Sequence, residues 1–480
     1  MTAQPTVPAP AASAESAASS RDLAALRDLC GGAVHLRGDR GYDDARTPWN
    51  VAVDQRPAAV AYPASAAEVA EVVRAAAALG LRVAAQGTGH NAGPLGALDD
   101  VVLVRTSAMT GVTVDRGRLV ARAEAGVLWE DVVTAVAEHG LTALHGSSPD
   151  VGVTGYSLGG GIGWYARKLG MQANNVTALE VVTPAGDVVR ADAESNSELF
   201  WALRGGGGNF GVVTALEFRV FDFDTVYAGW LVYDGSRAAE VLRAWSAWSA
   251  DAPDEVTTAW RILNVPPIEE MPPPFRGRTI VVIDGAVMGT DEEAAAVLAP
   301  LRALEPEMDT FERQPTAALI RLHMDPEGPT PAVSDSLVLD SMPDAAIDAL
   351  VAAAGPGSGS SLILAELRQL GGALGRPHDG AGAMPAIAGQ FLFLAVGIAA
   401  TPEMAARSQA DATRAAQAVA PWQTCTYYLN LAENAVDTAK GYRAEAYARL
   451  QALRAQVDPA GLMVANHPIP TPQVDLPQQR

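Results

Sequence analysis

Two glycine-dense loops in the first half of the chain constrain its fold more than any other feature. The first reads Gln86-Gly-Thr-Gly-His-Asn-Ala-Gly93, and the second reads His145-Gly-Ser-Ser-Pro-Asp-Val-Gly-Val-Thr-Gly-Tyr-Ser-Leu-Gly-Gly-Gly-Ile-Gly-Trp164. Glycine lets backbone N–H groups approach phosphate oxygens and aromatic rings, because no Cβ stands in the way. Two such loops predict a large, phosphate-bearing cofactor, with His90 as the side chain to explain.

Length and charge narrow the class of protein. A chain of 480 residues is too long for one hydrophobic core, and ordinary domain sizes predict two or three domains. A net charge of −21 argues against nucleic acid and anionic membranes as partners, since binding them depends on cationic side chains. Lysine occurs only at Lys168 and Lys440, so the chain has no P-loop lysine.

The two ends and the cysteines predict a cytoplasmic protein. Cys30 and Cys425 are far apart and form no metal or disulfide pattern, which is typical of a reducing compartment. Met1 to Ser20 is rich in Ala, Ser and Pro and has no basic start or apolar core, so we expect a disordered tail and no export signal. No apolar run reaches the length of a membrane-spanning helix.

The first part of the chain has a mixed α and β pattern. Ser65 to Leu79 predicts a helix, with Ser65 as its cap and Gly80 as its stop, and the strand Leu81 to Ala85 leads into the His90 loop. A helix from about Leu128 to His139 precedes the second glycine loop. A third glycine loop follows Leu199 and continues into a strand.

After about Phe221 long strands alternate with amphipathic helices, which predicts one sheet with helices on one face. The expected strands are Val226 to Tyr233, Val256 to Ile262, Thr279 to Val287, Leu362 to Leu370 and Phe391 to Ile398, and the expected helices are Ser236 to Ser249, Asp291 to Leu304 and Pro402 to Val419. From Thr426 we expect a strand, then a helix from about Ala444 to Gln456.

Gly155-Tyr-Ser-Leu-Gly159 also fits the Gly-x-Ser-x-Gly elbow of α/β-hydrolases, with Ser157 as the nucleophile and His145-Gly146 near an oxyanion site. The elbow needs a helix that starts at the serine, whereas Ser157 is followed by Leu and three glycines, which disfavour helix. The run Gly159 to Gly163 meets the dinucleotide fingerprint poorly, because the order of strand, loop and helix is missing.

Several candidate residues also have purely structural interpretations. His90 in isolation would be a loop histidine bonded to a carbonyl, and Tyr427 and Tyr428 would be strand-packing aromatics. Trp260 is most simply a core residue. Glu366, Arg368 and Gln369 share one predicted strand, on which Gln369 faces the opposite way, and an ion pair or a solvated face explains them without a site.

Taken together, the motifs resemble the berberine-bridge-enzyme-like branch of the vanillyl-alcohol-oxidase superfamily of FAD proteins, roughly from Asp44 to Ile469. They are Gly87-Thr-Gly-His90, Val151 to Gly163, Glu198 to Thr214, Glu366-Leu-Arg368, Tyr428-Leu-Asn430, and Asp458-Pro459 to Asn466. The resemblance implies an α+β fold: a two-part PCMH-type FAD-binding domain, with an inserted substrate domain built on an antiparallel sheet covered by helices. After a tail at 1–20, the expected divisions are the first part of the FAD-binding domain at 21–222, the substrate domain at 223–424, and a segment at 425–480 that completes the FAD-binding domain.

The resemblance also implies a covalent bond from the His90 ring to the 8α-methyl of the flavin, and neutral imidazole is a suitable nucleophile. Trp260, Glu366 and Gln369 are the expected substrate residues, and no metal is expected. The implied cofactor-binding residues are His90, Gln86, Gly87, Thr88, Gly89, Asn91, Ser148, Val151, Gly152, Val153, Gly155, Tyr156, Gly159, Gly160, Gly161, Gly208, Asn209, Val213, Asn430 and Asn466.

Two departures from the family pattern qualify the resemblance. Many relatives attach the flavin a second time through a cysteine in Gly-x-Cys-Pro-x-Val-Gly, and here Ser148 occupies that position. The flavin is therefore expected to be held by one bond, as in hydroxynicotine-oxidase-like members. Pro385-Ala-Ile387 stands where relatives often have Pro-His-Arg, so that part of the pattern is not transferred.

The implied activity is an oxidase that moves hydride from a C–H of a small organic substrate, such as an alcohol, sugar, alkaloid or polyketide, to FAD and then to O2, forming H2O2. Tyr428 is the first candidate for base or for orienting the substrate O–H or N–H. In plant relatives valine at the position of Val151 admits O2 and leucine obstructs it. The alternatives are a hydrolase built on Ser157, a flavin dehydrogenase with another acceptor, and a flavin-binding protein without turnover.

Overall fold

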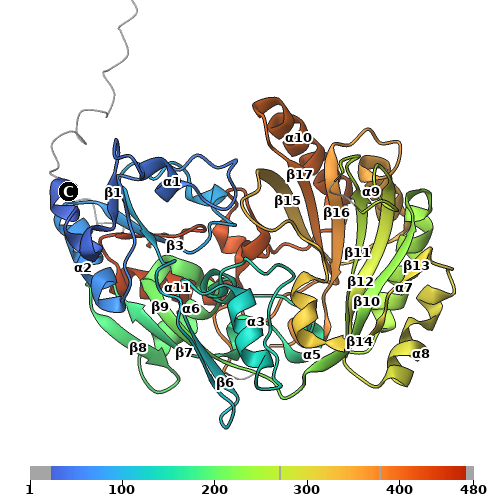
Figure 1. Ribbon diagram of the computed structural model, residues 1–480, viewed down its shortest axis with the longest axis horizontal. Helices are drawn as coiled ribbons and strands as arrows, with labels where there is room; N and C mark the ends of the chain where they lie inside the picture. The colour runs from blue at the N-terminus through green and yellow to red at the C-terminus, as the bar shows by residue number, and fades with distance from the viewer. Residues whose placement is uncertain (1–22, 270–271, 378–379, 472–480) are drawn as a thin grey trace, which may run out of the picture.

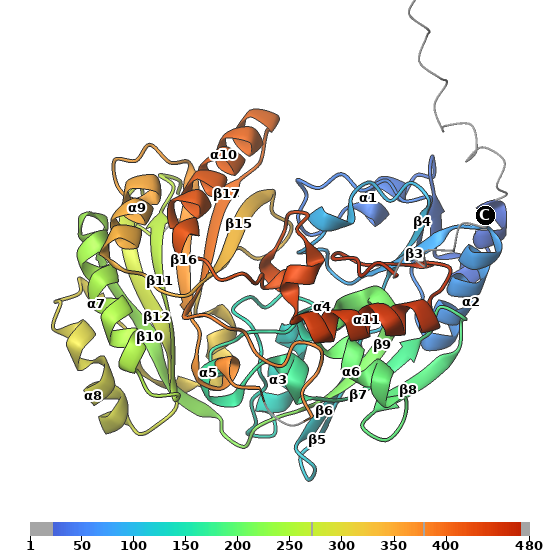
Figure 2. The same cartoon turned by 180° about the vertical axis from the view of Figure 1, so that it is seen from behind.

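The computed structural model describes residues 23–269, 272–377 and 380–471, so the predicted tail at 1–20 lies outside the described residues. The described strands form three sheets (Figures 1 and 2). The first sheet has the order β1-β2-β4-β3-β18, and all its pairs except β1 with β2 are parallel. Its strands are β1 (Val34–Leu36), β2 (Ala59–Ala61), β3 (Arg82–Gln86), β4 (Val101–Arg105) and β18 (Met463–Val464).

The second sheet is antiparallel and has the order β5-β6-β9-β7-β8. Helix α2 (Ala66–Ala78) packs between the first two sheets, because its buried valines share a core with Val83 of the first and Val212 of the second. The Ser65 side chain caps α2 by accepting a hydrogen bond from the Glu68 N–H, as predicted. The strands are β5 (Val112–Asp115), β6 (Val120–Glu124), β7 (Val176–Val182), β8 (Val188–Asp192) and β9 (Val212–Arg219).

The third sheet is antiparallel, and its strands all lie between residues 225 and 398. Its order is β13-β10-β12-β11-β16-β17-β15, with β14 paired to β10. The strands are β10 (Thr225–Asp234), β11 (Val256–Asn264), β12 (Thr279–Val287), β13 (Met308–Asp309), β14 (Glu312–Pro315), β15 (Ala332–Leu339), β16 (Leu362–Gln369) and β17 (Phe391–Ile398). The expected strands are found within a few residues, whereas β15 was not predicted.

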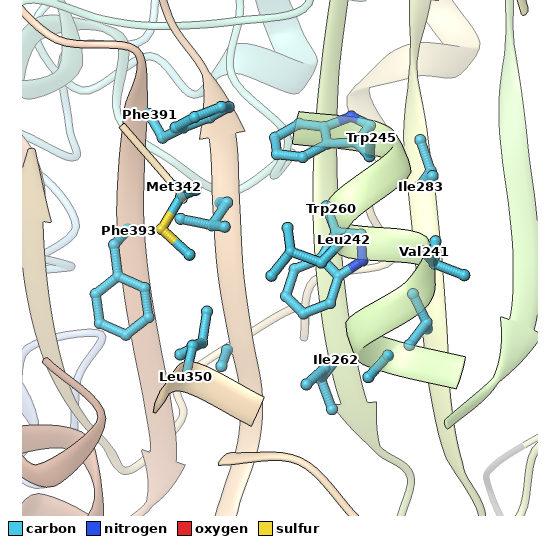
Figure 3. Close-up of a cluster of buried hydrophobic side chains, with 14 of the residues drawn as sticks. Val241, Leu242, Trp245, Trp260, Ile262, Ile283, Met342, Leu350, Phe391 and Phe393 are labelled. Carbon is cyan, nitrogen blue, oxygen red and sulfur yellow. The ribbon is translucent and has the colours of Figure 1, made fainter. Parts of the chain in front are cut away.

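Four helices cover one face of the third sheet and bury the core between them and the strands (Figures 1 and 3). They are α7 (Ala238–Asp251), α8 (Asp291–Arg302), α9 (Asp344–Ala354) and α10 (Pro402–Val419). Trp245, Trp260, Phe391 and Phe393 are among the large aromatic side chains in this core. The other face of the sheet is turned toward the N-terminal half (Figures 1 and 2).

The remaining helices lie mostly around the first two sheets. They are α1 (Tyr42–Arg46), α3 (Trp129–Ala137), α4 (Val153–Leu158), α5 (Ala166–Leu169), α6 (Ser197–Gly206) and α11 (Ala444–Val457). Arg167 of α5 forms hydrogen bonds with the part of the chain that contains the third sheet. Its guanidinium donates to the carbonyls of Leu370, Pro253, Val256 and Ala252 at 2.6–3.0 Å, so the positive charge is buried but fully hydrogen-bonded.

The C-terminal segment differs from the expectation. The predicted strand from Thr426 is absent, and Leu429–Leu431 instead forms a single 3₁₀ turn. The predicted helix is α11, and the following loop brings β18 alongside β3 in parallel register. The chain therefore returns to the first sheet beside the strand that leads into the His90 loop. No helix in the described ranges is long and apolar enough to cross a membrane.

Candidate functional site

A cavity of about 430 Å³ lies between the three glycine loops and the uncovered face of the third sheet. That volume is in the range of small-molecule and cofactor sites. One wall consists of the loops after β3, before α4 and after α6, and the opposite wall consists of β16 and β17. The turn at Leu429–Leu431 and the loop after β18 close one side. Segments distant in sequence thus meet at one site.

The first loop follows β3 directly, so Gln86 to Asn91 line the cavity as predicted. Gly89 has a φ of +89°, and a Cβ on it would lie 2.6 Å from the Pro48 Cβ, so only glycine fits. This close approach lets the Trp49 N–H bond to the Thr88 carbonyl at 2.9 Å. The Gln86 carboxamide is held by Gln55 at 3.0 Å and by Arg105.

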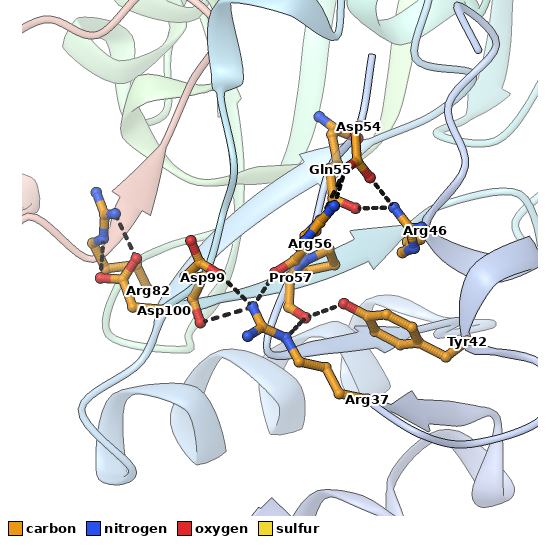
Figure 4. A network of polar contacts seen from close by, with 10 residues as sticks. All are labelled: Arg37, Tyr42, Arg46, Asp54, Gln55, Arg56, Pro57, Arg82, Asp99 and Asp100. Atoms are coloured by element: carbon orange, nitrogen blue, oxygen red, sulfur yellow. Dashed lines mark hydrogen bonds and ion pairs between the residues drawn. The ribbon is translucent and has the colours of Figure 1, made fainter. Parts of the chain in front are cut away.

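Charged side chains hold the segment that carries Trp49 (Figure 4). Arg46 pairs with Asp54 at 2.5 Å and donates to the Gln55 carbonyl at 2.7 Å, so the two ends of this loop are joined. The same Gln55 contacts Gln86 through its side chain. The network therefore places Trp49 beside the first glycine loop.

His90 projects into the cavity and contacts three side chains. Its ring stacks on the Trp49 indole, with centroids 4.0 Å apart and planes inclined by 17°. Nδ1 lies 2.8 Å from the Thr88 hydroxyl, and Nε2 lies 3.3 Å from the Asp150 carboxylate. The carbonyl hydrogen bond expected for an ordinary loop histidine is not among these contacts.

The second loop contributes Ser148, Val151, Gly152, Gly155, Tyr156 and Gly159 to the cavity wall. Three predicted cofactor residues do not line it. Val153 is fully buried in the core of the second sheet, and Gly160 and Gly161 lie behind the wall against the rings of Tyr428 and Tyr156. Their positions correct the expectation of direct contact and indicate a packing role.

The hydrolase alternative does not fit this loop. Ser157 lies in the last turn of α4 and is buried, whereas a nucleophile elbow exposes its serine at the start of a helix. Its Oγ has no hydrogen-bond partner among the described residues, so no base activates it. His145 is also buried, and burial lowers its pKa to about 4.

The third loop joins the cavity to the C-terminal segment. Gly208, Asn209 and Val213 line the cavity, as do the unpredicted Gly205 to Gly207. The Asn209 amide donates to the Gly206 carbonyl at 2.9 Å and to the His467 carbonyl at 3.0 Å. Asn466 likewise donates to the Asn91 carbonyl, so the tail binds the first and third loops.

Tyr428 and Asn430 reach the cavity from the C-terminal turn. The Tyr428 hydroxyl accepts a hydrogen bond from the Gly161 N–H at 2.8 Å and one from Asn430 Nδ2 at 3.5 Å. Asn430 also donates to the Tyr156 carbonyl at 2.9 Å. Burial raises the pKa of Tyr428 to about 12, although these hydrogen bonds and the Arg368 charge act in the opposite direction. Tyr428 is therefore a neutral phenol at neutral pH.

The sheet wall combines one polar corner with an aliphatic surface. Glu366 is fully buried and holds Arg368 through Nε at 2.8 Å, so the expected ion pair is present but the solvated face is not. His323 bridges Glu366 at 3.1 Å and Asp284 at 2.8 Å. Burial opposes a positive charge on His323, but the two carboxylates raise its pKa to about 9. The rest of this wall is Ile363, Leu364, Leu392, Leu394, Val396 and Ile398.

Trp260 and Gln369 do not lie in the site, which corrects their assignment as substrate residues. Trp260 is fully buried in the core under the covering helices (Figure 3). Gln369 bonds to the Ser249 carbonyl of α7 and to Thr258, on that same side. Successive side chains of a strand point to opposite faces of the sheet. Trp260 and Gln369 therefore lie on the face covered by helices, whereas Glu366 and Arg368 lie on the face that forms the cavity wall.

The cavity fits a dinucleotide such as FAD. A Cβ added at Gly155 or Gly208 would meet no protein atom within 4 Å, so the loops leave room directly above their backbone. Glycine loops of this kind bring N–H groups to a diphosphate. His90 and the aliphatic residues of β16 and β17 line the same cavity.

Sequence reasoning missed Trp49, Asp150, Asp325, Arg368 and Glu433 as cavity or near-cavity residues. Asp150 lies inside a motif that was identified, and Arg368 in a strand that was predicted. Burial raises the pKa of Glu433 to about 7, although a hydrogen bond from Ser334 opposes the change. No group of three or more His, Cys, Asp or Glu side chains placed to hold a metal occurs in the part of the chain that the structure describes.

Comparison with known proteins agrees with this geometry. Residues 57–192 match the model of the FAD binding domain. The chain is 35% identical to (R)-6-hydroxynicotine oxidase of Paenarthrobacter nicotinovorans over 40% of its own length, and the match spans only 42% of that relative. Wild-type berberine-bridge-enzyme-like 1 of Physcomitrella patens has the same fold, with a TM-score of 0.77, 22% identity and coverage of 91% and 96% of the two chains.

A second structure is that of glucooligosaccharide oxidase from Acremonium strictum, which is described by its 6-S-cysteinyl, 8α-N1-histidyl FAD. It has a TM-score of 0.77 and 22% identity, and the alignment covers 93% and 98% of the two chains. The resemblance inferred from the glycine loops and the predicted α+β fold are both confirmed. Residues 57–192 therefore form an FAD binding domain, and the chain as a whole has the fold of the berberine-bridge-enzyme-like proteins.

Proposed function

We propose that the protein is an FAD-dependent oxidase of a small, largely apolar organic molecule. Bound FAD would supply the redox chemistry, since it accepts hydride from a substrate C–H and passes the electrons to O2 to give H2O2. The observation that carries this proposal is the single cavity in which His90, three glycine loops and Tyr428 face the wall of β16 and β17. The oxidases among the relatives support it.

His90 would hold the flavin through one covalent bond. It is the only histidine in the glycine loop, its ring is fixed by Trp49 and Thr88, and it lies in the cavity. Ser148, which occupies the family's cysteine position, contacts Asp150 at 3.0 Å and has no thiol for a second bond. The glucooligosaccharide oxidase with both links differs from this chain in that respect.

Tyr428 would orient the substrate. Its oxygen accepts the Gly161 N–H, so its own hydrogen is available for an oxygen or nitrogen of the substrate. A phenol with a pKa of about 12 is protonated at neutral pH, which favours this orienting role over that of a free base.

The aliphatic part of the sheet wall favours an apolar substrate over a sugar. Leu364, Leu394 and Val396 offer no hydrogen bond, and a buried hydroxyl without a partner costs about 1–3 kcal/mol. A sugar would place several hydroxyls against this wall, whereas an apolar body gains about 25 cal/mol per Å² buried there. Glu366 and Arg368 provide one polar corner for the oxidised end of the molecule.

A screen for H2O2 release tests the proposal. Purified protein would be mixed in air with apolar alcohols, hydroxylated alkaloids, aromatic polyketides and oligosaccharides. We expect release with an apolar class and none with oligosaccharides. Flavin reduction without H2O2, followed by rapid transfer to a dye, would identify a dehydrogenase, and failure of every class to reduce the flavin would support an inert binder.

A further inference from the structure

Asp150 is the one carboxylate that contacts the His90 ring in the described structure. Its Oδ1 lies 3.3 Å from His90 Nε2, on the side of the ring opposite the Thr88 contact at Nδ1. Both side chains are about three-quarters buried or more, with 25% of the His90 side chain and 20% of the Asp150 side chain exposed. The two nitrogens of the ring therefore have different surroundings.

Three other donors hold Asp150 in place and keep it ionised. Oδ2 accepts the Trp49 indole N–H at 2.6 Å and the Gly328 N–H at 2.8 Å, and Oδ1 accepts the Ser148 hydroxyl at 3.0 Å. Burial alone would raise the pKa of Asp150, but the neighbouring His90 ring and the hydrogen bonds from Gly328 and Trp49 lower it below its usual value. Trp49 thus supports both members of the pair, since its ring also stacks on His90.

The surroundings of the His90 ring favour one of its two tautomers. Nε2 has no well-aligned hydrogen-bond partner among the described residues, but it lies 3.3 Å from the Asp150 carboxylate. A negative charge at that distance attracts an N–H and repels a lone pair, so it favours the form with hydrogen on Nε2. Nδ1 then carries the lone pair, next to a hydroxyl that can rotate. The nitrogen that can act as a nucleophile is thereby chosen before any cofactor reacts.

We propose that Asp150 is a positioning residue for covalent attachment of the flavin to His90, and this inference rests on the proposed function. In the linking step the Nδ1 lone pair forms a C–N bond to the 8α-methyl carbon, and one C–H bond of that methyl breaks. The electron pair and the proton of that bond pass to the ring system, and O2 then takes this pair together with that proton and one proton from solvent, which yields H2O2. The imidazole keeps its Nε2 hydrogen and becomes a cation, which the Asp150 carboxylate stabilises.

Ser148 helps to hold the Asp150 carboxylate in place. Where relatives carry a second covalent bond, this chain has a hydroxyl that donates to Asp150. A flavin that is held by one covalent bond depends wholly on His90 for its attachment. We therefore expect the rate of attachment to depend on the negative charge of Asp150. Replacing that charge by an amide of the same shape should slow linking by roughly 10- to 100-fold, the size of effect that follows when a charged partner is removed from a largely buried site.

The test follows linking in time. Apoprotein made in riboflavin-starved cells is mixed with FAD in air, and acid-precipitated flavin is measured against total bound flavin. The wild type should link its flavin, Asp150→Asn should bind FAD with similar affinity but link it roughly 10- to 100-fold more slowly, and Asp150→Glu should recover part of the rate. Asp325→Asn is the matched control, because Asp325 is a carboxylate beside the same cavity that accepts a hydrogen bond from Ser147 and does not contact His90.

The possible results distinguish a failure of the role proposed for Asp150 from a failure of the covalent attachment on which that role depends. A wild-type rate in Asp150→Asn would overturn the role of Asp150 while leaving the covalent link intact. Loss of non-covalent FAD binding in both Asp150 variants, or equal slowing in Asp325→Asn, would also overturn it, because the effect would then be structural or general. A wild type that binds FAD and never links it would contradict the covalent attachment itself.

Discussion

The Tyr428 hydroxyl accepts a hydrogen bond of 2.8 Å from the backbone N–H of Gly161. This bond joins the C-terminal turn to the second glycine loop and fixes the phenol in the cavity wall. Because burial raises the pKa of Tyr428 to about 12, its hydrogen is present at neutral pH and can bind the substrate. The function proposed for Tyr428 depends on this arrangement.

Tyr428→Phe should slow flavin reduction by roughly 10²- to 10³-fold, as the loss of one fixed donor in an active site does. Flavin content should change little, since the phenyl ring keeps the packing. Anaerobic stopped-flow reduction isolates this step. Tyr427→Phe is the control, because the neighbouring ring packs outside the main cavity. Equal rates for both variants would move the role away from Tyr428.

Val151→Leu should slow reoxidation by O2 and leave reduction by substrate nearly unchanged. Val151 lines the cavity, and one added methylene in a packed wall can close a passage that barely admits O2. Mixing pre-reduced protein with aerated buffer measures the oxidative step, and the reductive step serves as the internal control. Unaltered reoxidation would show that O2 reaches the flavin by another route.

Glu433→Gln should make the protein less sensitive to rising pH. The pKa of Glu433 is raised from 4.5 to about 7, so the folded state holds this proton more tightly than the unfolded state does. The free energy of unfolding therefore falls as pH rises from about 4.5 to 7, and the loss is complete above 7. The free energy of unfolding would be measured with denaturant at about pH 5 and about pH 8, which together span most of that range. Glu445→Gln, a substitution at an exposed position, is the control. An equal loss of the free energy of unfolding with rising pH in the wild type and in Glu433→Gln would contradict the raised pKa of Glu433.

Trp260→Ala should destabilise the fold by about 3–5 kcal/mol, as large truncations in cores do. It should not alter the KM for substrate, since Trp260 lies in the core behind the sheet (Figure 3). Leu394→Ala, on the cavity face, should instead raise KM by about tenfold. Urea unfolding measures the stability of both variants, and steady-state kinetics measures their KM. A raised KM in Trp260→Ala but not in Leu394→Ala would show that Trp260 contacts the substrate after all.

Much of the fold follows from local patterns in the sequence. Ser65 and Gly80 bound α2 because a side-chain cap and a residue of positive φ act locally. The apolar run Thr279–Val287 is a central strand as predicted. β15 was missed because Ser334, Asp335 and Ser336 interrupt its apolar pattern; the two serines bond to Glu433 and to the Leu431 carbonyl, contacts set by the tertiary fold.

The site was only partly predictable for a related reason. The alternation along β16 shows that Gln369 faces away from Glu366 and Arg368, but it does not show which face meets the cavity. Topology decides that, because helices from residues 238–419 cover the other face. Asp150 reaches His90 across a long separation in sequence, and no periodicity signals such a contact.

The visible spectrum of the purified protein, taken before and after acid precipitation, tests the central claim most directly. Our account predicts the absorption bands of oxidised flavin, with the flavin retained in the precipitate of the wild type and released to the supernatant from His90→Ala. A protein that remains colourless after incubation with FAD, or one whose flavin stays in the precipitate when His90 is replaced, would contradict it.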